Sequence, residues 1–114
     1  MRSDDILLVQ GAAGSVGLAA IQLAANHGAT VLAVQSGTER IDCLYRLGAS
    51  AVVDRRSQNI IEFVREVTKG AMASVVLETV GGASLDSSIA ATRAFGRILL
   101  IGNASQQPMR PDLW

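Results

Sequence analysis

The sequence contains a single cysteine, Cys43, and a single histidine, His27. A disulfide within the chain is therefore excluded, which fits a reducing cytoplasm. The same scarcity leaves no zinc site built from Cys and His in this chain. We interpret Cys43 as a small buried hydrophobic residue and His27 as a residue that interacts with a helix C-terminus.

An excess of charge and a long apolar run are also missing. The chain carries 10 Lys and Arg against 10 Asp and Glu, so nothing favours nucleic acid as a partner. No apolar run approaches the ~18 residues that a membrane span requires, and the first residues do not resemble a signal peptide. We therefore expect a cytoplasmic protein that binds neither nucleic acid nor membranes.

Hydrophobic residues make up 49% of the chain of 114, enough for the core of one domain. Short apolar runs alternate with helical patterns, and continuous apolar runs are typical of parallel strands covered on both faces. Expected strands cover residues 6–10, 30–35, 51–53, 74–79 and 97–101, and expected helices cover residues 15–27, 36–47, 59–69 and 82–92. This order predicts an α/β fold, a doubly wound parallel sheet of five strands in the order 3-2-1-4-5.

The most informative segment is the glycine-rich turn at residues 11–17, between the first strand and the first helix. Gly14 and Gly17 match the second and third glycines of G-x-G-x-x-G, whereas Ala12 occupies the first position and permits a tight turn if its φ stays negative. Glycine lets the backbone approach phosphates, and the N–H groups at a helix start attract anions. No Gly-Lys-Ser/Thr follows, which excludes a P-loop, and a turn without a ligand is the alternative.

Three segments follow strand ends in the predicted topology: residues 11–16, 80–81 and 102–103. Doubly wound sheets bind ligands beyond the carboxyl ends of their strands, where the strand order reverses. The convergence of these segments therefore predicts a dinucleotide site more strongly than any one of them does.

The end of the second strand indicates which dinucleotide is bound. NAD-binding proteins place an acid there for the ribose 2′-hydroxyl, but this chain has Gln35 followed by Ser36. The next carboxylate, Glu39, is expected to form a capping box with Ser36 at the start of the second helix. Arg40 and Arg55 can meet a phosphate, so NADP is favoured over NAD, although Arg40 as a merely solvated residue is the alternative.

Residues 11–24 closely resemble the cofactor (Rossmann) domain of the medium-chain dehydrogenases/reductases, especially the zinc-independent quinone oxidoreductase branch. The resemblance continues at residues 47–49, 78–82 and 96–102, and it covers nearly all of residues 5–105 in order. It implies cofactor contacts by Ala12, Ala13, Gly14, Ser15 and Val16 at the pyrophosphate, Ser36 and Arg40 at the 2′-phosphate, Arg55 at the adenine end, Val80 and Gly81 near the nicotinamide ribose, and Gly102, Asn103 and Ala104 at the nicotinamide.

Members of that family also carry a catalytic domain that supplies the substrate pocket, and nothing in this sequence matches it. Residues 1–105 are therefore interpreted as an NAD(P)-binding domain and residues 106–114 as an irregular tail. The resemblance implies hydride transfer from NADPH to a quinone or enone in the complete enzyme, whereas the isolated chain is expected to be inactive. A stand-alone nucleotide-binding module is the alternative, and an S-adenosylmethionine-binding fold fits the later segments poorly.

Two expectations concern the last strands. Glu78 lies at a strand end with no evident partner, so it is not a candidate acid or base. The family's sixth strand is absent, which makes residues 97–101 an apolar sheet edge and predicts a homodimer through it. The alternative is a monomer in which residues 108–114 cover that edge.

Overall fold

The computed structural model describes residues 1–101 of the chain. The predicted sheet of five parallel strands in the order β3-β2-β1-β4-β5 is confirmed. Its elements are β1 (Ile6–Gln10), α1 (Ser15–Asn26), β2 (Thr30–Gln35), α2 (Ile41–Leu47), β3 (Ala51–Asp54), α3 (Ile60–Val67), β4 (Ala73–Glu78), α4 (Ala83–Ala91) and β5 (Thr92–Leu100).

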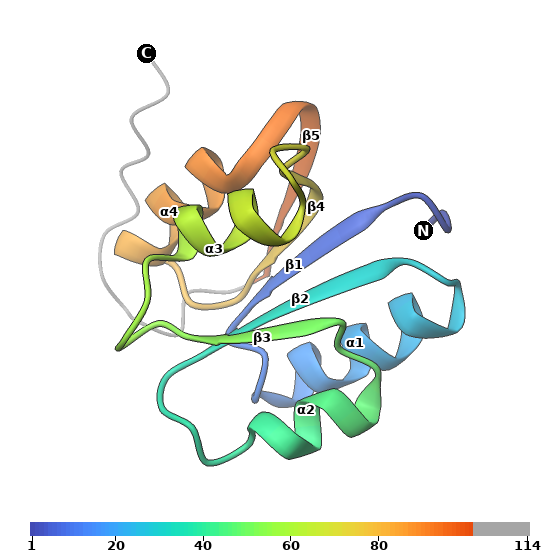
Figure 1. Cartoon of the computed structure of the whole chain (residues 1–114), viewed down its shortest axis with the longest axis vertical. Helices are drawn as coiled ribbons and strands as arrows, with labels where there is room; N and C mark the ends of the chain where they lie inside the picture. Colours follow the sequence, from blue (N-terminus) through green and yellow to red (C-terminus); the bar gives the residue numbers. More distant parts are fainter. Residues whose placement is uncertain (102–114) are drawn as a thin grey trace.

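Helices cover both faces of this sheet, with α1 and α2 on one face and α3 and α4 on the other (Figure 1). Successive strand residues point to opposite faces, so Leu7 packs in the core under α1 and α2 while Leu8 packs in the core on the α3 side. Both side chains are almost wholly buried. Burial on both faces explains why the strands appear in the sequence as continuous apolar runs.

The predicted capping box is wrong, because α2 begins at Ile41 with Arg40 as its N-cap residue and no side-chain cap. Ser36 and Glu39 lie in the loop before the helix. This loop is held from outside: the carboxylate of Asp54, at the end of β3, accepts the N–H of Gly37 at 2.7 Å. This hydrogen bond from a neighbouring strand holds Gly37 in the loop, and the helix begins about one turn later in the sequence than predicted.

The last strand is longer than predicted, because β5 begins at Thr92 rather than at residue 97. Its pairing with β4 shifts between Ala73 and Val75, which face Thr92 and Arg97 respectively. Within the shifted stretch Phe95 adopts a φ of 63° and is fully exposed. An irregularity of this kind lets one strand accommodate extra residues.

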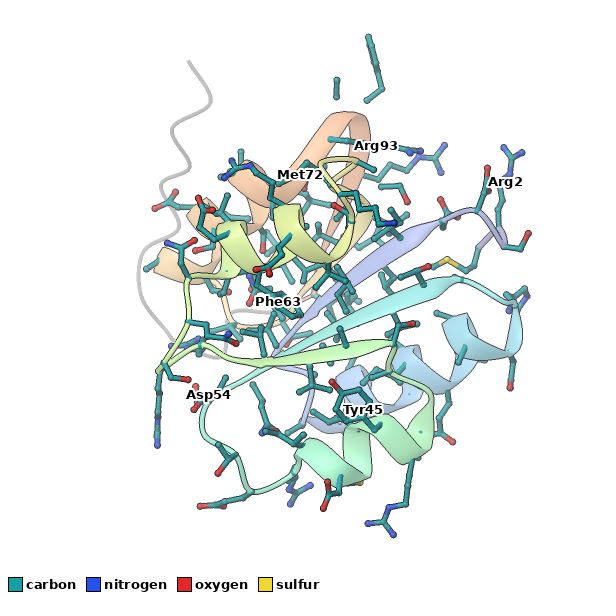
Figure 2. The ribbon with its side chains drawn as sticks, viewed as in Figure 1. Arg2, Tyr45, Asp54, Phe63, Met72 and Arg93 are labelled. Atoms are coloured by element: carbon teal, nitrogen blue, oxygen red, sulfur yellow. The ribbon has the colours of Figure 1, made fainter. Side chains whose placement is uncertain are left out.

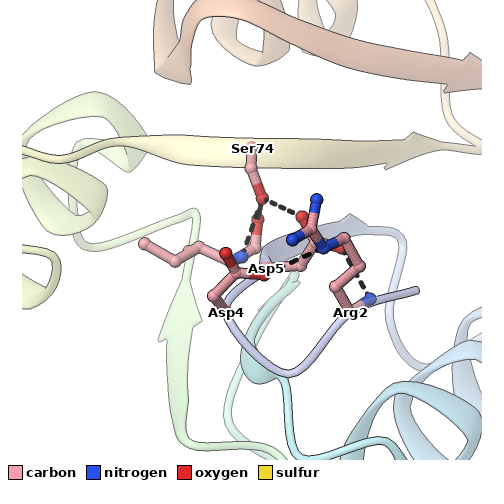
Figure 3. A network of polar contacts seen from close by, with 5 residues as sticks. Arg2, Asp4, Asp5 and Ser74 are labelled. Atoms are coloured by element: carbon pink, nitrogen blue, oxygen red, sulfur yellow. Dashed lines mark hydrogen bonds and ion pairs between the residues drawn. The ribbon is translucent and has the colours of Figure 1, made fainter.

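The amino ends of β1 and β4 are tied together by Ser74 (Figure 3). Its Oγ accepts the N–H of Ile6 at 2.8 Å and donates to Asp5 Oδ1 at 3.0 Å. The other carboxylate oxygen of Asp5 accepts the N–H of Arg2 at 2.8 Å. These hydrogen bonds, that of Arg2 first, hold the pKa of Asp5 below its ordinary value of 3.8.

Candidate functional site

The candidate site lies where β1, β2, β3 and β4 end, at the edge of the sheet on the left of Figure 1. There the glycine turn (residues 11–17) leads into α1, whose N-cap residue is Gly14 and which has no side-chain cap. The first helical hydrogen bond joins Leu18 N–H to Gly14 C=O at 2.9 Å. The N–H groups before it lie at the positive end of the helix and can bind an anion.

The three glycines of the turn differ in how closely their surroundings pack against them. Gly11 has a φ of +69°, and a Cβ there would lie 2.5 Å from Thr79 Oγ1. A Cβ on Gly17 would lie 2.7 Å from the carbonyl oxygen of Ala12, so this glycine brings α1 close to the turn. A Cβ on Gly14 would meet only one atom, at 3.5 Å. Gly11 and Gly17 are thus required by packing, whereas Gly14 borders open space.

Alanine is tolerated at the first glycine position of the motif, as expected. Positive φ values among non-glycine residues of the described chain occur at Lys69, Met72 and Phe95, and not at Ala12. Ala12 is fully buried, and its N–H donates to Val34 C=O at 3.0 Å. The next predicted contacts are more accessible: Ala13 is half-buried, and Gly14, Ser15 and Val16 are exposed.

The β2 loop (residues 36–37) is held by hydrogen bonds from both sides. Gln35 is buried and its Nε2 donates to Gly37 C=O at 2.7 Å, while Asp54 Oδ1 accepts the N–H groups of Gly37 and Arg56. These bonds, that of Arg56 first, hold the pKa of the Asp54 carboxyl below its ordinary value of 3.8. Asp54 lies at the end of β3, beside this loop (Figure 2). The exposed Ser36 thus lies on a loop that is hydrogen-bonded on both sides.

The arginines near this loop lie on different sides of it. Arg40, the N-cap residue of α2, is exposed. Arg55 lines a polar cavity with the start of α3 and Ser87 of α4. Arg56 lies nearer the β2 loop, because its Nη1 is 3.7 Å from where a Cβ on Gly37 would stand. Sequence reasoning missed Arg56, although its adjacency to Arg55 placed a second cation at the same strand end.

The β4 loop (residues 79–82) surrounds a buried carboxylate. Glu78 is fully buried, and its Oε2 accepts the N–H groups of Val80 at 3.0 Å and Gly81 at 3.1 Å. The Ser84 hydroxyl also donates to Oε2, at 3.0 Å, and the Ser88 hydroxyl donates to Oε1, at 2.6 Å. The expectation that Glu78 has no partner is therefore wrong. Two of its partners lie on α4, and the other two are backbone N–H groups of the loop itself.

Gln10, at the end of β1, joins this network from the other side. Its Nε2 donates to Ser88 Oγ at 3.1 Å, and its own C=O accepts the hydroxyl of Thr79 at 2.9 Å. Gln10 Oε1 is buried without a hydrogen-bond partner among residues 1–101, a state that costs about 1–3 kcal/mol. The amide is held this way because the proton of Ser88 goes to Glu78, which leaves Ser88 only as an acceptor.

Among residues 1–101, no group of three His, Cys, Asp or Glu side chains could hold a metal ion. His27 is exposed at the end of α1, where its Nδ1 lies 2.9 Å from Leu23 C=O, in agreement with its predicted place. Cys43 is half-buried rather than buried.

Gly102, Asn103 and Ala104, predicted near the nicotinamide, lie outside the described residues, as does the tail at 106–114. Within residues 1–101, no helix has the length and apolar character needed to cross a membrane. The described part of the candidate site therefore comprises the glycine turn, the β2 loop and the β4 loop.

Comparisons with known proteins agree with this arrangement. A family model described as "Zinc-binding dehydrogenase" matches residues 15–112. The quinone oxidoreductase-like protein 2 homolog of Nematostella vectensis is 38% identical over 100 residues, which cover 87% of this chain and 27% of that protein. The quinone oxidoreductase of Salmonella typhimurium is 31% identical over 105 residues, covering 92% of this chain and 32% of that protein.

A solved structure, Escherichia coli quinone oxidoreductase complexed with NADPH, superposes with a TM-score of 0.91 at 27% sequence identity. The match covers 99% of this chain and 35% of that one. The chain thus spans about a third of the length of the relatives that it matches.

Proposed function

The chain belongs to the zinc-binding dehydrogenase family. On this premise we propose that it is the NADP(H)-binding domain of a quinone oxidoreductase-like medium-chain reductase. The observation that carries the proposal is the uncapped start of α1 at Gly14, beside the switch between β1 and β4. Relatives of the quinone oxidoreductase branch support it, and one of them was solved with NADPH.

In this proposal the N–H groups at the start of α1 bind the pyrophosphate, as predicted for residues 13–16, and the buried Ala12, whose N–H donates to Val34, supports the turn. The 2′-phosphate lies at the β2 loop, near Ser36 and Arg40, with Arg55 toward the adenine. The β4 loop, through Val80 and Gly81, borders the nicotinamide ribose, and residues 102–104 reach the nicotinamide. In the complete enzyme the bound cofactor supplies a hydride for a quinone or enone, while this chain binds and orients the cofactor.

A preference for NADP over NAD is supported by the β2 loop. Gln35 takes the place of the acid that selects NAD, and its amide is turned toward Gly37. Titration calorimetry with NADPH and NADH tests this preference, and tighter binding of NADH contradicts it. Arg40→Ala should weaken NADPH alone, and Arg56→Ala extends the test to the second arginine. Arg46→Ala, at the far end of α2, is the matched control.

We propose further that the isolated chain does not turn over. Relatives are about three times longer, and a substrate domain is needed to position the acceptor and exclude water. A steady-state assay should find no saturable oxidation of NADPH by quinones, and a turnover in the ~1–1000 per second range of ordinary enzymes contradicts this. The alternative, a nucleotide-binding module without catalysis, shares the binding predictions, and the reading frame around this segment distinguishes the two.

A homodimer through β5 is the proposed assembly. In the sheet that residues 1–101 form, β5 is an edge strand, and its Leu99 and Leu100 are 51% and 47% exposed. Unpaired strand edges with apolar side chains favour pairing with another chain. Light scattering at micromolar concentration should give the dimer mass, and a monomer mass that persists after removal of residues 106–114 rules out edge pairing. A cytoplasmic location also stays part of the proposal, since one cysteine cannot form an intrachain disulfide.

A further inference from the structure

We propose that Glu78 is a positioning residue that fixes the β4 loop as one wall of the cofactor site. The inference rests on the proposed function, because NADP(H) is the ligand whose nicotinamide half this wall borders. Glu78 itself is fully buried and acts through the loop.

The contacts of Glu78 leave its carboxylate no freedom to turn. Oε2 accepts two backbone N–H groups, from Val80 and Gly81, and Oε1 accepts the Ser88 hydroxyl at 2.6 Å. The hydroxyl of Ser84 lies between the two oxygens, at 3.1 and 3.0 Å. Neither ion pair among residues 1–101 includes Glu78. Its orientation is thus set by hydrogen bonds alone, and each of them also fixes a donor of the loop or of α4.

These bonds determine which ligand groups the wall can bind. The N–H groups of Val80 and Gly81 point at Glu78 and are not available to an anion. The pyrophosphate is therefore directed to the start of α1, whose N–H groups have no side-chain cap. The last two carbonyl groups of the loop accept N–H groups at the start of α4, so we expect sugar hydroxyls to meet the C=O groups of Thr79 and Val80. Glu78 in this way separates the site into an anion half and a hydroxyl half.

The wall and the glycine turn are also joined to one another. Gln10 Nε2 donates to Ser88, which donates to Glu78, so the end of β1 is connected to the network under the β4 loop. Above it, Thr79 donates to Gln10 C=O and packs against Gly11 so closely that a Cβ would be 2.5 Å from its hydroxyl. The β4 loop and the glycine turn are therefore held together by side-chain contacts as well as by the pairing of β1 with β4.

The affinities for two ligands distinguish this positioning role from a general effect of Glu78 on stability. NADPH reaches both halves of the site, whereas 2′,5′-ADP lacks the nicotinamide half. Glu78→Gln keeps the side-chain shape but places an amide NH2 group against donors. We expect calorimetry to show about tenfold weaker NADPH binding for Glu78→Gln and a change below about twofold for 2′,5′-ADP. Amide resonances of Val80 and Gly81 should shift in the ¹⁵N–¹H spectrum.

Glu66→Gln, on the exposed side of α3, is the matched control and should change neither ligand. If Glu78→Gln does not fold, Ser84→Ala removes one donor and should weaken NADPH by about threefold with 2′,5′-ADP unchanged. Equal loss of both ligands, or of neither, overturns the inference while the wild-type chain still binds NADPH. If the wild-type chain binds neither ligand, the proposed function fails and the inference fails with it.

Discussion

The two loops of the candidate site are built alike but differ in burial. Each is held by a carboxylate at the end of a strand: Asp54 accepts the N–H groups of Gly37 and Arg56, and Glu78 accepts two N–H groups of the β4 loop. Asp54 is partly exposed, whereas Glu78 is fully buried. Water can replace a lost hydrogen bond at Asp54 but not at Glu78, where donors would stay unpaired. The β2 loop can therefore adjust, and the β4 loop cannot.

The largest difference should come from adding one methyl group at Gly11, which packs against the β4 loop, and one at Gly37, which lies in the β2 loop. Gly11→Ala places a Cβ at a φ of +69° and 2.5 Å from Thr79 Oγ1, whereas Gly37→Ala, at +93°, meets nothing closer than 3.7 Å. We expect destabilisation of about 3 kcal/mol for Gly11→Ala and about 1 kcal/mol for Gly37→Ala. Urea unfolding measures both. Equal losses would show that the β4 side is no more rigid than the β2 side.

Ser88→Ala should have the next largest effect. It removes the 2.6 Å bond to Glu78 and leaves the Gln10 amide without its acceptor. Because both groups are buried, the free energy of unfolding should fall by about 2 kcal/mol. Ser87→Ala is the control on the same helix, since the Ser87 hydroxyl makes no hydrogen bond with residues 1–101. Thermal unfolding of the pair gives the difference, and similar midpoints would contradict a buried network.

The smallest effect should be the pH dependence contributed by Asp54. Its pKa is lowered from 3.8 by the backbone N–H groups of Arg56 and Gly37. A lowered pKa contributes stability that is present above the unfolded pKa and is lost as pH falls through the folded pKa. The gap between wild type and Asp54→Asn should thus be constant at neutral pH and close in acid, in urea midpoints measured from pH 7 to 3.

Asp5 shares this acid window, because its pKa is also lowered from 3.8. Because both chains carry Asp5, its contribution cancels in the gap, and the same gap should be found when the comparison is repeated in an Asp5→Asn background. A gap that stays unchanged down to pH 3 would show that the Asp54 hydrogen bonds do not stabilise the folded chain.

The strands and the glycine turn could be predicted because their signals are local, and the strand order then follows from the right-handed crossovers that connect parallel strands. Continuous apolar runs mark buried parallel strands, and the spacing of Gly14 and Gly17 marks a strand-to-helix turn. Even the tolerance of Ala12 follows from its own φ. These features depend on residues that are neighbours in the sequence, so no knowledge of packing is needed to find them.

The hydrogen bonds that hold the loops could not be predicted in this way. Ser84 and Ser88 reach Glu78 only after α4 has packed over β4, and Asp54 reaches Gly37 from a strand 17 residues away. The capping box at Ser36 was locally favourable, but a tertiary contact prevails over it. The side of the loop on which Arg56 lies is likewise set by the fold.

The network at Glu78 also bears on the order in which the molecule folds. Its hydrogen bonds to Ser84 and Ser88 close short segments of 6 and 10 residues, whereas Gln10 and Ser88 are 78 residues apart. Short loops cost less chain entropy, so the β4–α4 unit can form early and the contact with β1 late. The binding surface between the two is then complete only in the fully folded chain. A nucleotide bound there binds only the fully folded chain. It therefore stabilises the native state and should slow unfolding.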